Sequence, residues 1–457
     1  MSSPPSVDAV PVSPLNKKER INFLDAVRGI AVLGILIVNI TAQGQSHFFY
    51  NHMNLNEPLT GPNLYSWVIE MGFFEGNMRG LFSILFGVST ILLITRLETS
   101  KGTKAAAYLY YRRIFWLLIF GCINAYVFLW PGDILYSYAV CALVLFPFRN
   151  SSVKVLLLCV FIMLAMDFYH SVRAMRYNHT VMANGEKDSL LERHNHKLTK
   201  KEQADLRNWK QTEERDNPAY MMKRGLAETA KVQSSNYGQL FVFYGKDLML
   251  RQTIGFYYNW LDIMLFFFIG MALYRSGFIL GTKPLWLYGS IAFVGTVLGL
   301  LINYHILNLQ YISRFNATTD YESFPYGLYM MRRILQTMGY LSIFILLYRI
   351  VPLRRLFNLF SPVGQMALTN YLSQSVITSI IFYGFGLYGH FQRYELYEIM
   401  VLIWIFQVAF CNIWLKYFLF GPFEWVWRSL TYLKAQPFKK VRENIPAETV
   451  SGTVANL

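Results

Sequence analysis

The chain has 457 residues, of which 54% are hydrophobic and only 15% are charged, and its formal net charge is +15. A soluble globular chain carries about 25% charged residues, so the composition excludes an ordinary soluble domain. The basic residues lie in short segments beside long apolar runs, where lipid headgroups and membrane topology account for them, and no nucleic-acid partner is expected. The four cysteines lie inside apolar runs without metal-site spacing, so no metal site is predicted.

Ten apolar runs predict an all-α, polytopic bundle of about ten transmembrane helices. In chain order they cover residues 23–42, 80–94, 108–130, 134–148, 153–169, 256–278, 285–307, 326–350, 364–386 and 396–420. A shorter aromatic run at 64–74 is expected to lie along the membrane interface.

The loops between these runs alternate in charge, with lysine and arginine concentrated on every second loop. Because basic loops remain on the cytoplasmic side, both termini are predicted to be cytoplasmic. Between the fifth and sixth runs lies a charged segment without a spanning run, which predicts an extramembrane helical insert. The predicted organisation is a disordered cytoplasmic arm (1–19), five helices (20–169), an extracytoplasmic insert (170–252), five further helices (253–433) and a cytoplasmic tail (434–457).

Polar side chains inside an apolar run are costly unless they are paired or face water, so the few present are the candidate functional residues. Asp25 and Arg28 are spaced i, i+3 at the start of the first run and can pair on one helix face. Gly29 and Gly34 permit close approach of another helix. Asn39 lies about three turns further along, where an amide can bond a neighbouring helix or bind a substrate.

The loop after the first run carries His47 and His52 among aromatic residues. Histidine titrates near neutral pH and can act as a general base, so both are candidate catalysts. The alternative is a pair of solvated histidines at an aromatic interface. Glu75 and Arg79, spaced i, i+4 before the second run, can pair with each other or face a polar cavity, where Arg79 would anchor the helix or bind an anion.

The third run begins with Arg112 and Arg113, and Asn124 lies about three turns deeper. Asp133 belongs to a tight Trp-Pro-Gly-Asp turn. We expect it to cap the following helix through the free N–H groups of the first turn.

In the second half, Asp262 is the only acid on its run, and Arg332 and Arg333 are adjacent on another. Adjacent residues point to different faces of a helix, so at least one arginine should point into the bundle. There it would pair with Asp262 or hold an anionic group. Asn370 and Gln374 belong to a polar stripe that either joins helices or lines a cavity.

Several motifs resemble the YeiB family of bacterial inner-membrane proteins. They are FLDAVRGIA at 23–31, LFSILFG at 81–87, WPGDIL at 130–135, IGMAL at 269–273, GQMALTNY at 364–371 and GPFEWVWR at 421–428. The resemblance runs from about residue 20 to residue 433 and implies a multi-pass protein of the bacterial inner membrane.

That family is similar in its first helices to transmembrane acyltransferases, including the heparan-alpha-glucosaminide N-acetyltransferase type and the type 3 acyltransferases. The resemblance therefore implies transfer of an acyl group from acyl-CoA, a co-substrate, to an extracytoplasmic glycan or lipid acceptor. Arg28, Arg112 and Arg113 would bind the phosphates of acyl-CoA. Asn39, Asn124 and a loop histidine would act at the acceptor end.

Two positions depart from these relatives. Type 3 acyltransferases have a histidine where this chain has Asn39, and YeiB proteins commonly have a histidine where it has Asn124. Asparagine cannot relay a proton at neutral pH. His47 or His52 must then supply the base, or the activity is altered or absent.

Two other functions remain open from the sequence. In a transporter of a small solute or lipid, Asp262, Arg332, Arg333 and the polar stripe would line a substrate path without covalent chemistry. In a regulatory membrane protein, the insert would bind an outside partner. Membrane lipids are expected partners in every case, and a homo-oligomer is compatible with each.

Overall fold

The computed structural model describes residues 17–315 and 327–440, and these segments fold into a bundle of α-helices. Their only β-pairing is an isolated bridge between Phe418 and Lys439. The predicted all-α class is therefore confirmed. The predicted arm (1–19) and tail (434–457) lie largely outside the described residues.

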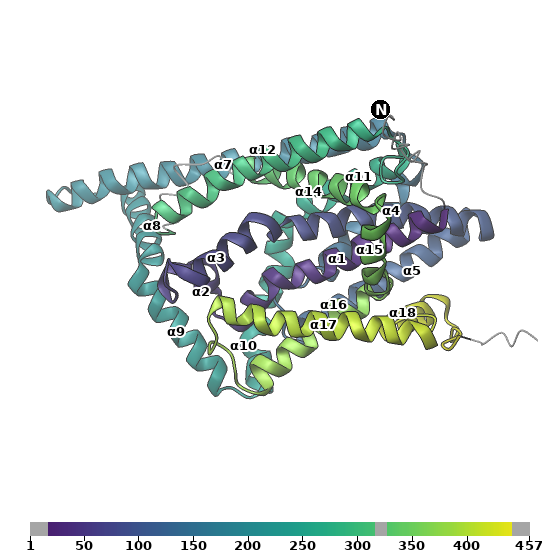
Figure 1. Ribbon diagram of the computed structural model, residues 1–457. Helices are drawn as coiled ribbons and strands as arrows, with labels where there is room; N and C mark the ends of the chain where they lie inside the picture. Colours follow the sequence, from purple (N-terminus) through teal and green to yellow (C-terminus); the bar gives the residue numbers. More distant parts are fainter. Residues whose placement is uncertain (1–16, 316–326, 441–457) are drawn as a thin grey trace, which may run out of the picture.

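The helices of the first half alternate with short π and 3₁₀ turns. They are α1 (Lys17–Gly44), α2 (His47–Asn51), the 3₁₀ turn Met53–Leu55, α3 (Gly61–Ile69), the π-turn Glu70–Phe74, α4 (Asn77–Lys101), α5 (Thr103–Cys122), the π-turn Ile123–Val127, α6 (Leu135–Ala142), the 3₁₀ turn Phe146–Asn150 and α7 (Val153–Arg193). Figure 1 shows α1 and α4 in the middle of the bundle, with α7 and α12 along one side and α17 along the opposite side.

The second half has the same character. Its elements are α8 (Lys200–Asp216), α9 (Pro218–Ser234), α10 (Tyr237–Leu250), the π-turn Arg251–Gly255, α11 (Phe256–Arg275), α12 (Leu285–Ile312), α14 (Gly327–Tyr348), α15 (Val351–Gln365), α16 (Ala367–Ser379), the π-turn Ile380–Gly384, α17 (Arg393–Tyr417) and α18 (Pro422–Tyr432).

Within the described residues, six helices are long and apolar enough to cross a membrane, or up to eight if each of two bent pairs is one span. The number is smaller than the ten predicted runs because some runs are broken. The run at 134–148 forms α6, of only 8 residues, and then a 3₁₀ turn that contains Pro147. The run at 364–386 is interrupted at Met366, after which α16 has 13 residues. A full crossing by a single helix needs about 20 residues.

Close helix packing at α1 depends on glycine. A Cβ on Gly29 would lie 2.2 Å from the carbonyl oxygen of Phe360, and a Cβ on Gly364 would lie 1.8 Å from that of Asp25. Both contacts are with backbone atoms, which cannot rotate away. The expectation that Gly29 permits a close helix neighbour is met by α15, while Gly34 faces the Met78 side chain of α4.

The insert begins as a continuation of a membrane helix. α7 has 41 residues, which at about 1.5 Å per residue is roughly twice the hydrocarbon thickness of a bilayer. The predicted boundary at residue 170 therefore falls inside one unbroken helix. α8 packs back against α7, with Trp209 over Gly185, and α9 packs against α2. The insert thus covers the α2 end of the bundle (Figure 1).

Candidate functional site

The span from α3 to α4 is interrupted in its middle. The π-turn Glu70–Phe74 ends at Glu75, and Gly76 has a φ of +72°, a left-handed conformation that favours glycine. A Cβ on Gly76 would also lie 2.4 Å from Nε of Arg333. α4 starts immediately afterwards at Asn77. Such a break leaves backbone carbonyls without helical partners, and inside a membrane these need other donors.

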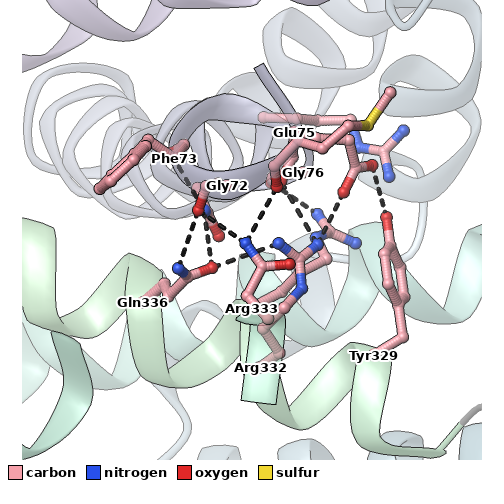
Figure 2. A network of polar contacts seen from close by, with 12 residues as sticks. Gly72, Phe73, Glu75, Gly76, Tyr329, Arg332, Arg333 and Gln336 are labelled. Carbon is pink, nitrogen blue, oxygen red and sulfur yellow. Dashed lines mark hydrogen bonds and ion pairs between the residues drawn. The ribbon is translucent and has the colours of Figure 1, made fainter. Parts of the chain in front are cut away.

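Side chains of α12 and α14 supply those donors. Figure 2 shows the two from α14, Gln336 and Arg333, pointing at the broken segment. The carbonyl of Gly72 accepts hydrogen bonds from Asn303 Nδ2 at 2.7 Å and from Gln336 Nε2 at 3.1 Å. The carbonyl of Gly76 accepts one from Arg333 at 2.9 Å. The broken segment is therefore held by long polar side chains from two neighbouring helices.

Five charged residues around this break form what we call the paired cluster: Glu75, Arg79, Asp262, Arg332 and Arg333. Arg332 pairs with Glu75 at 2.6 Å, Arg333 with Asp262 at 2.5 Å, and Arg79 with Asp262 at 3.0 Å. The structure thus brings together Glu75 and Arg79, which the sequence placed just before the second run, with Asp262, Arg332 and Arg333 from two later runs. Glu75 and Arg79 pair with other partners rather than with each other. Three arginines face two carboxylates, an excess of one positive charge.

A second group of arginines lies near the start of α1, and we call it the basic end: Arg28, Arg113 and Arg428. Arg28 binds Asp25 at 2.7 Å and Ser89 at 2.9 Å. Arg113 stacks on Trp427 with its guanidinium carbon 3.5 Å from the ring centre, and Arg428 stacks on Phe420 at 4.3 Å. Along the described chain, neither Arg113 nor Arg428 has a salt-bridge partner, although both are half-buried.

The charges of Arg428 and Arg28 repel Arg113, whereas that of the buried Glu424 attracts it. Burial lowers the pKa of Arg428. Arg112 is not part of this group. It lies over the ring of Tyr108 on its own helix, at 4.9 Å.

Asn124 and Asp133 meet at the other end of α5. Asn124 Nδ2 donates to Asp133 Oδ1 at 2.8 Å, and Oδ2 of the same carboxylate accepts from the backbone N–H of Tyr136 at 2.8 Å, in the first turn of α6. This is the contact expected of a capping residue. Burial raises the pKa of Asp133 to about 7 against the effect of these hydrogen bonds.

His47 pairs with a residue of the insert. Its Nδ1 lies 2.9 Å from Glu228 of α9, which also accepts a hydrogen bond from the Ser46 hydroxyl at 2.6 Å. Burial raises the pKa of Glu228, but these hydrogen bonds outweigh it and hold the pKa below its usual value. His52 Nδ1 instead lies 3.2 Å from the carbonyl of Phe48. The carboxylate of Glu228 therefore orients the ring of His47.

The amides of the predicted polar stripe connect helices. Asn370 Nδ2 donates to the carbonyls of Val363 and Met366 at the break before α16, and Gln374 Nε2 donates to Gln407 on α17 at 3.0 Å. Asn39, on α1, is half-buried.

One buried cluster was missed in the sequence: Arg393 with Glu57 and Glu70. Arg393 binds Glu70 at 2.7 Å and Glu57 at 3.3 Å, and all three side chains are almost completely buried. A signal was present, because Glu70 is an acid inside the aromatic run 64–74. That run was interpreted as interfacial, where a glutamate needs no partner.

Apolar helices that enclose paired charges define a multi-pass helical membrane protein. Residues 273–434 match the family described as protein of unknown function (DUF418). The chain is 28% identical over 449 residues to the uncharacterized protein YxaH of Bacillus subtilis, covering 94% of this chain and 98% of that protein. It is 27% identical over 432 residues to the uncharacterized protein YeiB of Escherichia coli, covering 92% and 98%. These matches confirm the predicted resemblance to the YeiB family. No solved structure matches the chain.

Proposed function

We propose that the protein is a membrane acyltransferase that takes an acyl group from acyl-CoA at the basic end and transfers it to an acceptor at the end covered by α9. One observation carries the proposal: Arg113 and Arg428 are half-buried and close together and stack on aromatic rings, and within the described residues neither forms a salt bridge, although the charge of the buried Glu424 acts on both. Like charges held together out of water are stabilised by an anion that lies between them.

The phosphates of acyl-CoA have the chemistry that these arginines fit. A guanidinium stacked on an aromatic face keeps its N–H edges free, and those edges can donate two parallel hydrogen bonds to a phosphate. Arg28 has one side already engaged by Asp25 and Ser89. Arg113 and Arg428 would therefore supply most of the binding energy.

At the opposite end, His47 is the best-placed base. Glu228 accepts from Nδ1 and thereby favours the tautomer in which Nε2 is free to take a proton. In the reaction, the acceptor hydroxyl or amine would lose its proton to His47 as its oxygen or nitrogen bonds the acyl carbon. The thioester C–S bond would break, and the proton taken by His47 would pass to the sulfur, so that CoA leaves as the thiol. His52 Nδ1 lies 3.2 Å from the carbonyl of Phe48, and we assign the proton transfer to His47 because of its contact with Glu228.

The test is binding of acetyl-CoA to the purified protein in detergent, measured by calorimetry. Arg113→Gln removes a charged hydrogen-bond donor, for which about 1.5–3 kcal/mol is typical, so the dissociation constant should rise at least about tenfold. Arg112→Gln is the matched control, because Arg112 is adjacent in sequence but stacks on its own helix. Equal binding by both variants, or no binding by the unmodified protein, would refute the proposal.

A second candidate is transport of an anionic solute, and the interrupted span favours it. Transporters commonly place an anion at the N-terminus of a half-helix in the middle of the membrane. Here α4 begins beside the paired cluster, which has one excess positive charge. This candidate predicts that Asp262→Asn abolishes solute uptake by vesicles without unfolding the protein. Uptake unchanged by this variant would exclude the paired cluster as the substrate path.

A further inference from the structure

A narrow groove of about 260 Å³ lies at the outer surface of the bundle, between α10 and two π-turns. Its lining residues are Val127, Phe128, Leu129, Tyr237, Leu240, Val376, Ser379, Ile380, Tyr383 and Gly384. A π-turn widens a helix locally, and such turns often lie at functional sites. In this groove, the end of Ile123–Val127 faces the π-turn Ile380–Gly384.

The groove offers few polar groups to a ligand, because the hydroxyl groups of Ser379 and Tyr237 already donate hydrogen bonds to backbone carbonyls. Ser379 donates to the carbonyl of Phe128 at 2.5 Å, and Tyr237 donates to the carbonyl of Val127 at 2.7 Å. A water molecule would find few partners, and water needs two or more to occupy a buried site. The volume also lies below the roughly 300–1,000 Å³ typical of sites for drug-sized molecules. The space therefore fits a thin apolar group better than a nucleotide or a sugar.

The mouth of the groove is continuous with an exposed apolar surface. Val127 is 47% exposed, Ile380 51% and Tyr237 53%, and Phe385 beside them is exposed as well. In a membrane protein, such side chains contact lipid hydrocarbon. Aromatic rings gather at the same place, including Tyr383, whose ring centre lies 6.0 Å from that of Tyr244. Tyrosine rings of this kind mark the level of the lipid headgroups.

We propose that this groove binds one hydrocarbon chain of a membrane lipid, with the polar head of the lipid at the mouth. Asn124 belongs to the same π-turn as Val127, so a chain in the groove lies within one turn of the Asn124–Asp133 contact. The lipid is then the acceptor, or carries the acceptor glycan. This last step rests on the proposed acyl transfer, whereas the binding of the chain does not.

The experiment uses the full-length protein in nanodiscs of phosphatidylethanolamine and phosphatidylglycerol, with a trace of phosphatidylglycerol that bears a diazirine on its acyl chain. After illumination, mass spectrometry maps the labelled peptides. Gly384→Trp fills the groove, and it should fold because a Cβ at this position meets nothing closer than 3.8 Å. Gly289→Trp on α12 is the matched control, since a Cβ there meets nothing within 4 Å.

We expect label concentrated on peptides that contain residues 127–129 and 376–384, and at least a fivefold loss of that label in Gly384→Trp but not in Gly289→Trp. Label spread evenly over the exposed faces of α12 and α17, or unchanged by Gly384→Trp, would overturn the inference. Val376→Phe serves as a second filling variant if Gly384→Trp does not fold. Acetyl-CoA binding of the same samples is measured separately, so failure of acyl transfer and failure of lipid binding give different results.

Discussion

The paired cluster and the basic end are both rich in arginine, but the arginines have different partners in the two places. In the paired cluster, Arg332 and Arg333 are almost completely buried and each meets a carboxylate within 2.6 Å. At the basic end, Arg113 and Arg428 are half-buried and stack on aromatic rings, and among the described residues neither forms a salt bridge, with Glu424 the carboxylate whose charge acts on both. Paired charges fix a backbone break in place, whereas unpaired charges leave donors for a ligand. The number of arginines is therefore less informative than the presence or absence of a carboxylate.

The largest expected effect comes from breaking the paired cluster. Arg332→Met leaves the half-buried Glu75 without its salt-bridge partner, and removal of one partner from a buried pair costs about 3–5 kcal/mol. The melting temperature in detergent should fall sharply. The double variant Arg332→Met with Glu75→Gln removes the orphaned charge and should recover much of the loss. A double variant as unstable as the single one would show that Arg332 acts through packing and through its bond to Gln336.

The second effect concerns the contact between Gly364 of α15 and Asp25 of α1, which lies beside Arg28 of the basic end. Gly364→Ala forces a Cβ against the carbonyl of Asp25, and overpacking of this kind costs about 1–3 kcal/mol. Because Arg28 lies 3.5 Å from the carbonyl of Gly364, acetyl-CoA binding should weaken too. Gly289→Ala is the control and should leave the free energy of unfolding equal or slightly higher. Equal melting temperatures for the two variants would contradict the close α1–α15 contact.

The third prediction separates stability from binding. Arg113→Gln removes no ion pair and relieves repulsion from Arg428 but loses the stacking on Trp427, so the free energy of unfolding should fall by at most about 0.5–2 kcal/mol. The same variant should lose acetyl-CoA binding. A drop in stability as large as that of Arg332→Met would place Arg113 among structural residues and end the distinction between the two clusters.

Much of the fold follows from hydropathy, because a membrane helix must satisfy its backbone internally and so has a long apolar run. The breaks do not follow from hydropathy. The π-turn at Glu70–Phe74 lies in an aromatic run with no proline, and the donors that hold it, Asn303 and Gln336, lie more than 200 residues away. Hydropathy also places the end of α7 too early. The sequence predicts a membrane helix that ends at residue 169 because the segment after it is polar, but this polar half continues as a helix against which α8 packs.

For the candidate site, the sequence predicts which charged residues matter better than it predicts the residues with which they pair. The charges at Asp262, Arg332 and Arg333 stand out in apolar runs, and the structure joins them. Arg393 was missed because it starts its helix, where a basic residue is ordinary, and its partner Glu70 was placed at the interface. Glu228 was missed because the insert holds many solvated acids. Only packing of α9 on α2 brings it to His47.

The smallest effect is expected where the insert meets the bundle, at the bond between Glu228 and His47. The pKa of Glu228 is lowered in the folded protein, so its contribution to stability is fully present above the ordinary glutamate value of 4.5 and is lost as the pH falls through the lower, folded value. Amide hydrogen exchange in α9, corrected for the intrinsic rate, should therefore accelerate relative to exchange in α5 only as the pH falls below 4.5. Glu228→Gln should remove this pH dependence and cost about 1 kcal/mol, whereas Glu213→Gln on the exposed face of α8 should change neither. If α9 is equally protected in the Glu228→Gln variant at every pH, apolar packing such as Phe49 against Gly225 is what holds the insert, and His47 must be oriented by another group.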